Sequence, residues 1–202
     1  MKRCLSWSIV LIMLLSLTAV FAENQKKKEG TLKDKKIVMI IAERMFEASE
    51  YKESKDIFEQ EGAKVIVAGS TLSEASGSGL YMMTVKPDIL ITDIETKNFD
   101  AIVFIGGIGC AEYFDNPMAH KIAKQALDQG KIIAAICGAP VILANAGLLK
   151  GKKVTTSRSY NIKQKGAIYT GNPVEHDGNI ITANGPGAAT EFGKAIVSAL
   201  SE

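Results

Sequence analysis

The sequence predicts an α/β fold in which an open, mostly parallel sheet is covered by helices on both faces. Two observations lead to this class. Apolar runs rich in β-branched residues alternate with segments of helical periodicity, and most of these runs lack polar alternation, which is typical of strands buried on both faces. The chain has 202 residues, 47% of them hydrophobic, and this is enough for one domain with a sizeable core.

Strands and helices are expected in alternation along the domain. The first strand (36–42) is a continuous apolar run, and the helix after it (47–60) has apolar positions at helical spacing and ends before Gly62. A later helix is expected to begin at Pro117, because a first helical turn accepts proline. The other strands are expected at residues 64–68, 79–85, 89–92, 101–105, 131–136, 154–156, 167–170 and 180–182. The other helices are expected at residues 117–129, 140–145 and 186–200.

The chain begins with the pattern of a secretory signal. A basic pair, Lys2 and Arg3, precedes an apolar stretch at residues 5–17, and small residues lead up to Ala22. We expect cleavage after Ala22 and export to the periplasm or another extracytoplasmic space. The alternative is a membrane anchor, because residues 5–22 come near the length that crosses a bilayer.

The rest of the chain divides into a short tether and one domain. Residues 23–35 are charged and almost free of apolar side chains, which is typical of a solvated tether, and the domain follows at residues 36–202. Without the signal (1–22), 22 basic residues balance 22 acidic ones. This balance favours neither nucleic-acid binding nor adhesion to an anionic membrane.

Three loops are candidates for a functional site. In an open parallel sheet the crevice that binds ligands lies beyond the carboxyl ends of the strands. That rule selects the loop after Ala42, the Gly106-Gly107 loop and the turn at Cys137.

Cys137 lies in the stretch AAICGAP, between an apolar strand and a helix. Small residues surround it at Ala135, Gly138 and Ala139, as a nucleophile elbow requires. At the start of a helix, N–H groups and the helix dipole favour a thiolate, so we expect a lowered pKa and a reactive thiol. A buried structural cysteine fits the same local pattern equally well.

The other two loops offer an oxyanion hole and an acid. The N–H groups of Gly106 and Gly107 can point into the crevice, although Gly-Gly after a strand is also a common tight turn. The first loop carries Glu43, Glu47 and Glu50. Of these, Glu47 at the helix start is the one expected to point back over the strand ends as a general acid and base. The residues alone favour solvated acids at all three positions.

Histidine and metal ligands add little to the prediction. The chain has two histidines, His120 and His176, and both are expected at the surface, so a Cys–His dyad of the protease kind is not favoured. No spacing of Cys, His and carboxylate residues resembles a structural zinc site, and neither a metal nor a cofactor is expected.

Five segments of the chain resemble the ThiJ/PfpI family, and its deglycase-like subgroup in particular. They are KIVMIIAERMFEASE, FDAIVFIGGIG, GKIIAAICGAP, GKKVTT and VEHDGNIITANGPGAATEFGKAIVSAL. They follow one another in the family's order from about residue 36 to residue 200. The resemblance implies a flavodoxin-like three-layer sandwich, similar to class I glutamine amidotransferases, and a homodimer.

The same resemblance implies roles for individual residues. Cys137 matches the family's nucleophile, and Glu47 matches the glutamate that contacts it. Gly107 and Gly138 match positions whose backbone N–H groups line the site. These correspondences make Glu47 a catalytic candidate, which the residues alone do not.

Two positions depart from the family's pattern. Gly138 stands where the peptidase branch has a histidine, directly after the cysteine, and Ser157 stands where the deglycase subgroup often has one. Peptidase activity is therefore not expected. Gly106, Ser157 and Arg158 are further expected to line the pocket, with Arg158 either holding an anionic substrate group or lying at the surface.

The expected activity is on small reactive dicarbonyls such as methylglyoxal, or on their adducts with proteins. The alternative is a stress-protection protein without turnover, which senses oxidation through Cys137 or holds unfolded clients. Cys110 lies four residues after Gly106, in the loop beside the expected site, and the predicted compartment is oxidising. It is a candidate redox partner, through a sulfenic acid that resolves as a disulfide.

Overall fold

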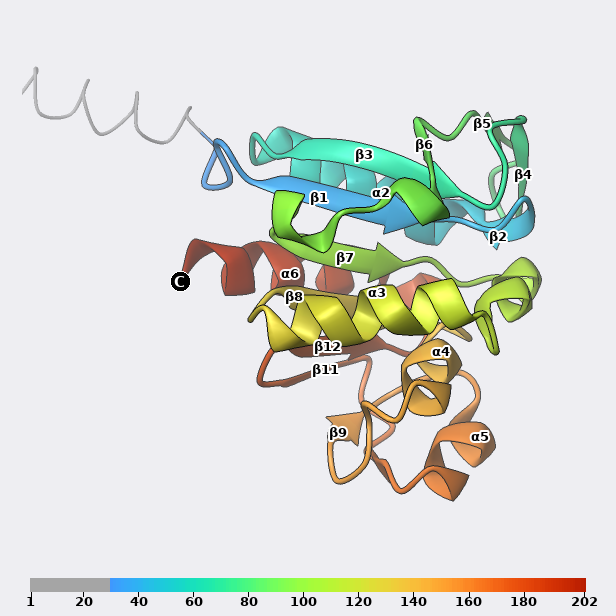
Figure 1. Ribbon diagram of the computed structural model, residues 1–202, viewed down its shortest axis with the longest axis vertical. Coiled ribbons are helices and arrows are strands. Elements are labelled where there is room, and N and C mark those ends of the chain that lie inside the picture. Colours follow the sequence, from blue (N-terminus) through green and yellow to red (C-terminus); the bar gives the residue numbers. More distant parts are fainter. Residues whose placement is uncertain (1–29) are drawn as a thin grey trace, which may run out of the picture.

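The computed structural model describes residues 30–202, which form a three-layer α/β sandwich (Figure 1). Its middle layer is a seven-stranded sheet in the order β11-β12-β8-β7-β1-β3-β6. The strands are β1 (Lys36–Ile40), β3 (Lys64–Gly69), β6 (Ile89–Leu90), β7 (Ala101–Phe104), β8 (Ile132–Ile136), β11 (Val174–Asp177) and β12 (Ile180–Ala183). Neighbouring strands are parallel except for β11 and β12. The predicted class, a mostly parallel sheet within an α/β fold, is confirmed.

The central strands are buried on both faces. Every residue of β7, β8 and β12 is buried, and in β1 only Lys36 is exposed. In the register of the sheet, Val38 lies between Ile66 of β3 and Ile102 of β7. This double burial is why these strands read as continuous apolar runs, and each buried aliphatic side chain contributes about 1.5–3 kcal/mol.

Helices cover the two faces of the sheet. On one face, α2 (Ala48–Gln60) and α6 (Ala189–Ser201) pack side by side, α2 also against β3 and α6 against β12. On the other face, α3 (Pro117–Asp128) packs against β7 and β8 (Figure 1). The short helices α4 (Pro140–Asn145) and α5 (Ser159–Gln164) pack on each other, and α4 also contacts α3. No helix among residues 30–202 is long and apolar enough to span a membrane.

Smaller elements surround the sandwich. A second sheet contains β2 (Arg44–Glu47), β4 (Ala75–Ser78) and β5 (Thr84–Val85), and a third pairs β9 (Lys153–Val154) with β10 (Ile168–Tyr169). The 3-10 helices are η1 (Ile91–Asp93), η2 (Thr96–Asn98), η3 (Ile108–Tyr113) and η4 (Pro186–Ala188). The main sheet fixes the position of the sheet that contains β2, because β2 begins only a few residues after β1 ends.

Several predicted boundaries are wrong. Of the strand expected at residues 79–85, only residues 84–85 form a strand (β5), and residues 79–83 are a turn between β4 and β5, because Gly79 has a φ of 92° and Leu80, Tyr81 and Met82 are exposed. Strand β9 ends at Val154, and the last helix is preceded by the turn of η4. The predicted elements do not include β2, β4, α5 and the polar edge strand β11. The predicted signal at residues 1–22 lies outside the described residues.

Gly193 is the residue of α6 that allows its close approach to α2. A Cβ at this position would lie 2.9 Å from Ile57 Cδ1 and 3.4 Å from Ser54 Cα. We expect Gly193→Leu to lower the free energy of unfolding by about 1–3 kcal/mol, measured by urea denaturation, because overpacking strains a filled interface. Gly187→Leu is the control, since nothing lies within 4 Å of a Cβ there. An equal loss in both variants would contradict this account of the interface.

Candidate functional site

The three loops selected from the sequence meet at one edge of the main sheet. Strands β8, β7 and β1 are parallel neighbours, so their carboxyl ends lie together. The segments that leave these ends carry Cys137, the Gly106-Gly107 pair and the chain that runs from Ala42 into β2. The predicted convergence is confirmed, and it brings together groups that are far apart in the sequence.

Cys137 occupies a sharp turn between β8 and α4. Its φ is 62°, in the left-handed region that side chains rarely adopt, and such a conformation costs on the order of 1–3 kcal/mol. The surrounding backbone holds it there. The Cys137 N–H donates to the Ala183 carbonyl over 2.9 Å, and the Cys137 carbonyl accepts hydrogen bonds from the Ser157 N–H and the Thr156 hydroxyl. This is the geometry of a nucleophile elbow.

Gly106 stands between the cysteine and a buried acid. A Cβ on Gly106 would lie 2.6 Å from Cys137 Cβ and 2.7 Å from Glu50 Oε2. The Gly106 N–H donates to that same Glu50 oxygen over 3.0 Å. Only a glycine lets the two side chains come this close across the end of β7.

Glu50 lies in the first turn of α2 and is fully buried. Burial raises the pKa of its carboxyl group to about 8, the Gly106 N–H opposes this rise, and the nearby negative charge of Glu47 adds to it. At pH 7 the carboxyl group therefore keeps its proton. Within the described part of the chain, Glu50 Oε1 accepts no hydrogen bond, so it is the oxygen free to carry that proton.

The environment of Cys137 differs from the one expected at a helix end. Burial raises the pKa of the thiol, and the negative charge of an ionised Glu50 raises it further. The Ser157 hydroxyl, 3.4 Å from the sulfur, and the Gly107 N–H act in the opposite direction. The expected net lowering of this pKa is wrong, because α4 begins only at Pro140 and desolvation is the larger effect.

The Gly107 N–H is held in place by strand β2. Gly107 has a φ of 94° and forms a bridge with Phe46, and the Glu47 N–H donates to the Gly106 carbonyl over 3.0 Å. A Cβ on Gly107 would lie 2.4 Å from the Met45 carbonyl oxygen. The close packing of this loop explains both glycines, and it fixes the Gly107 N–H toward the sulfur.

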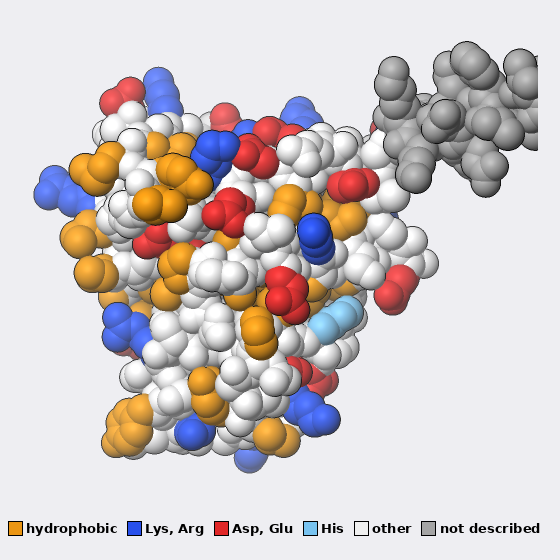
Figure 2. Space-filling model, turned by 180° about the vertical axis from the view of Figure 1, so that it is seen from behind, with side chains coloured by type: hydrophobic (Ala, Val, Ile, Leu, Met, Phe, Trp, Pro, Cys, Tyr) orange, Lys and Arg blue, Asp and Glu red, His pale blue; other side chains and the backbone are white. Residues whose placement is uncertain are grey.

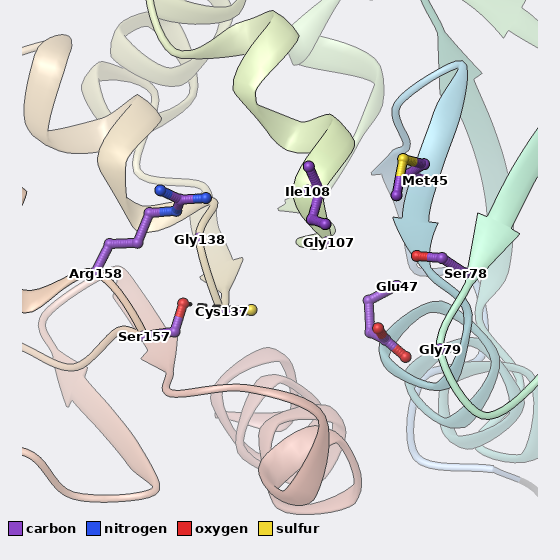
Figure 3. A pocket seen from close by; sticks show the side chains of 10 residues that line it. All are labelled: Met45, Glu47, Ser78, Gly79, Gly107, Ile108, Cys137, Gly138, Ser157 and Arg158. Carbon is purple, nitrogen blue, oxygen red and sulfur yellow. Dashed lines mark hydrogen bonds between the residues drawn. The ribbon is translucent and has the colours of Figure 1, made fainter.

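Above the thiol lies an open pocket of about 400 Å³ (Figure 3). It is lined by Met45, Glu47, Ser78, Gly79, Gly107, Ile108, Cys137, Gly138, Ser157 and Arg158. The cysteine and its backbone donors are therefore accessible to a small molecule. Gly106 does not line the pocket, so that expectation is wrong: its N–H faces the buried Glu50 instead. Residues 35–199 match the DJ-1/PfpI family. The chain belongs to the DJ-1/PfpI family.

Relatives within the DJ-1/PfpI family include proteins of three kinds. An uncharacterised protein of Methanocaldococcus jannaschii is 35% identical over 100% of this chain and 98% of its own length. A glutathione-independent glyoxalase of Caenorhabditis elegans is 32% identical over 72% of this chain and 77% of its own. A deglycase of Thermococcus kodakarensis is 34% identical over 63% of this chain and 77% of its own.

Solved structures of the family share the fold. The ThiJ/PfpI domain protein of Brachyspira murdochii superposes with a TM-score of 0.79 and 33% identity, covering 85% of this chain and 97% of its own. DJ-1β of Drosophila melanogaster gives a TM-score of 0.75 and 29% identity, covering 83% and 90%. The arrangement of elements described above is therefore that of the ThiJ/PfpI structures.

One assignment made for this DJ-1/PfpI chain needs correction: Glu50, not Glu47, is the glutamate beside the cysteine. Glu47 precedes α2 in extended conformation, and its carboxylate accepts a hydrogen bond from the Ser49 hydroxyl over 2.8 Å. Figure 3 shows this carboxylate turned toward Gly79, on the wall of the pocket opposite Arg158. Glu47 is thus a pocket-lining anion that does not contact the thiol.

The position of Glu50 had a signal in the sequence. Glu50, Ser54 and Phe58 follow one another at four-residue intervals, and all three are buried along one stripe of α2. Phe58 is apolar and marks the buried face of the helix. An acid on that face is costly to bury and is therefore a functional candidate.

The remaining predicted residues divide between the pocket and the interior. Gly138, Ser157 and Arg158 line the pocket as expected, and Ser157 lies against the thiol where the deglycase subgroup often has a histidine. Cys110 is fully buried beneath Gly138, and burial raises its pKa to about 12. Both Cys110 and Cys137 are free thiols, so their pairing after oxidation stays a prediction.

The two histidines lie outside the pocket. His176 on β11 is exposed, as expected. His120 is half-buried, and its Nε2 lies 2.8 Å from the Phe114 carbonyl oxygen. Neither lines the pocket, and residues 30–202 contain no cluster of three side chains able to hold a metal ion.

The raised pKa of Glu50 predicts how the free energy of unfolding depends on pH. Between the ordinary value near 4.5 and about 8, the folded protein holds one more proton than the unfolded chain. The free energy of unfolding should therefore fall as pH rises through this window, by at most about 1.4 kcal/mol per pH unit from this group. The Glu50→Gln variant has no carboxyl group to titrate, so its free energy of unfolding should lack this dependence on pH.

Denaturation of both proteins by urea at several values between pH 5 and pH 8 measures the effect. The difference between their slopes isolates Glu50, because the buried Tyr51 and Cys110 titrate near pH 12. Parallel curves for the two proteins would mean that Glu50 is ionised in the folded state.

Proposed function

We propose that this protein is a cysteine-dependent enzyme that acts on small reactive dicarbonyls, or on their early adducts with proteins. The observation that carries the proposal is the approach of Glu50 to Cys137 across Gly106, at the floor of an open pocket. The site combines a nucleophile on an elbow, a neutral acid and a backbone donor. Relatives described as a glyoxalase and as a deglycase support the same class of substrate.

In the first step, the Cys137 thiol gives its proton to water in the open pocket, and the thiolate adds to the aldehyde carbon of methylglyoxal. A C–S bond forms, the carbonyl π electrons move to oxygen, and the Gly107 N–H stabilises the charge that develops there. Gly138, next to the nucleophile, supplies a second backbone N–H. Glu50 gives its proton to this oxygen, which leaves a neutral hemithioacetal and a Glu50 carboxylate.

In the second step, Glu50 acts as a base. Its carboxylate takes the hydrogen from the carbon attached to sulfur and returns it to the neighbouring carbon, while the hydroxyl proton moves to the adjacent oxygen. The hemithioacetal thereby becomes a thioester of lactate. Water then cleaves the C–S bond and releases lactate, and the two protons of this water go to the Glu50 carboxylate and to the sulfur, which restores the starting site. Methylglyoxal and one water are thus converted to lactate and a proton without an external oxidant.

Substitutions of the two central residues test this mechanism. Cys137→Ala and Glu50→Gln should each reduce lactate formation from methylglyoxal by at least about 100-fold, because one removes the nucleophile and the other the proton carrier. Glu47→Gln, which changes an acid away from the sulfur, should lose much less. Lactate followed by NMR measures all four proteins, and equal turnover by wild type and Cys137→Ala would end the proposal.

The alternative, an oxidation-sensing or holdase protein without turnover, has less support. Sensor cysteines oxidise readily because their pKa is low and they are exposed. Burial raises the pKa of Cys137, and its partner Cys110 is inaccessible. Mild peroxide treatment followed by mass spectrometry separates the two roles, since a sensor would show Cys137 oxidised at peroxide concentrations that leave an added free thiol largely reduced.

A homodimer is part of the proposal. Leu80 and Met82 are 82% and 88% exposed and Tyr81 is 40% exposed, on the turn between β4 and β5. Hydrophobic side chains gather over these strands at the upper left of Figure 2. Exposure of these apolar side chains to water is unfavourable, and a second copy of the chain would bury them.

Charged substitutions in this turn test the dimer. We expect wild type to sediment as a dimer and the double variant Leu80→Glu, Met82→Glu to sediment as a monomer, because burying two carboxylates in an apolar contact is costly. Ile168→Glu is the control, since Ile168 is 51% exposed on β10, in a separate sheet. A wild-type monomer, or a dimer that survives the double variant, would contradict the proposed contact.

Export is the last part of the proposal. Its support is the pattern of residues 1–22, in which a basic start precedes an apolar stretch and small residues. N-terminal sequencing of the protein recovered from its native cells would find Glu23 first if cleavage follows Ala22, and Met1 if the segment is retained.

A further inference from the structure

Arg158 presents a positive charge at the mouth of the pocket. It precedes α5, its side chain is exposed, and its N–H donates to the Thr156 hydroxyl over 3.1 Å. Its guanidinium carbon lies 5.6 Å from the centre of the Phe114 ring. Its Nε lies 3.1 Å from the place where a Cβ of Gly138 would stand. The head group is therefore held over the residue that follows the nucleophile (Figure 3).

This guanidinium has no carboxylate partner among residues 30–202. The ion pairs in this part of the chain use other cations, namely Lys52, Lys55, Lys97 and Lys152. Stacking on Phe114 orients the head group and leaves its hydrogen-bond donors unused by any acid. An arginine held in this way is suited to a planar anion such as a carboxylate.

The charges on the two sides of the pocket are opposite. Arg158 lies on the side of Cys137 and Ser157, whereas the Glu47 carboxylate lies on the far wall (Figure 3). An anionic group on a ligand is therefore attracted to one side and repelled from the other. A short ligand whose carboxylate binds Arg158 would extend toward Cys137, which lines the same pocket.

We propose that Arg158 binds a carboxylate of the substrate, so that the enzyme prefers α-oxoaldehydes that carry one carboxylate over neutral ones. This inference rests on the proposed function and narrows its substrate class. The preference follows from the position of one charge and requires no change in the chemistry at Cys137. Two experiments test it, and the first requires no turnover.

The first experiment compares the alkylation of Cys137 by iodoacetate and by iodoacetamide. Both reagents form the same C–S bond and release iodide, but only iodoacetate carries a carboxylate. The ratio of the two rate constants, measured on the Cys137 peptide by mass spectrometry, should fall about tenfold in Arg158→Gln. Arg158→Lys should give an intermediate ratio, because it keeps the charge without the planar fork.

Lys163→Gln is the matched control for this ratio. Lys163 lies on the helix that follows Arg158 and also stacks on an aromatic ring, Tyr169, but does not line the pocket. Removing its charge should leave the ratio within twofold of wild type. The proposal is overturned if Arg158→Gln leaves the ratio unchanged, or if Lys163→Gln lowers it equally.

The second experiment compares kcat/KM for an α-oxoaldehyde with a terminal carboxylate and for its neutral carboxamide. In Arg158→Gln the value for the acid should fall about tenfold, and the value for the amide should change less than twofold. If both substrates react and the variant affects them equally, the inference fails and the proposed function stands. If neither reacts but the alkylation ratio shifts as expected, the anion site stands and the proposed function fails.

Discussion

The close approach of Cys137 and Glu50 across Gly106 is the constraint on which the site depends. A side chain at Gly106 would overlap both the cysteine and the carboxyl group, which lie 2.6 and 2.7 Å from where its Cβ would stand. The approach requires β7 and β8 to end side by side, and the first turn of α2 to lie against Gly106, two residues after the end of β7. It also requires Cys137 to keep a φ of 62°, since an extended residue there would turn the sulfur away from the carboxyl group. The stability of the sheet thus maintains a strained turn.

Burial controls the protonation of this pair. Burial raises the pKa of both groups; an ionised Glu50 raises the pKa of Cys137 further, whereas the hydrogen bond with Cys137 lowers the pKa of Glu50, so the protonation of one group depends on that of the other. A neutral Glu50 removes the negative charge that opposes the thiolate. The hydrogen bonds from Ser157 and Gly107 then act on the sulfur without that repulsion. The proton on Glu50 therefore has two roles. It removes a charge that opposes the Cys137 thiolate, and it is the proton that Glu50 donates in the first step.

The sequence was sufficient to predict the main sheet and the elbow, because both depend on local patterns. Strands buried on both faces read as continuous apolar runs, and Cys137 stood between one such run and a Gly-Ala-Pro break. The acid was assigned three residues too early. Glu47 and Glu50 lie on the same short segment, and which of them turns inward depends on where the extended chain becomes helix. That point, Ala48, is fixed by the pairing of β2 with β4 and with Gly107, which are contacts distant in sequence.

The absence of histidine from the pocket limits the chemistry that the site can perform. Ser157 contacts the sulfur where the deglycase subgroup often has a histidine, and a hydroxyl group neither gains nor loses a proton near pH 7. Among the residues around the sulfur, Glu50 is the carboxylic acid with a pKa near neutrality. Cleavage of a peptide bond requires a base for the nucleophile and an acid for the leaving amine, with the two coupled in one cycle. An isomerisation requires only one group that takes a proton from one carbon and returns it to the next. A single buried carboxyl group beside a thiol fits that second kind of reaction, because each step leaves Glu50 in the form that the following step uses.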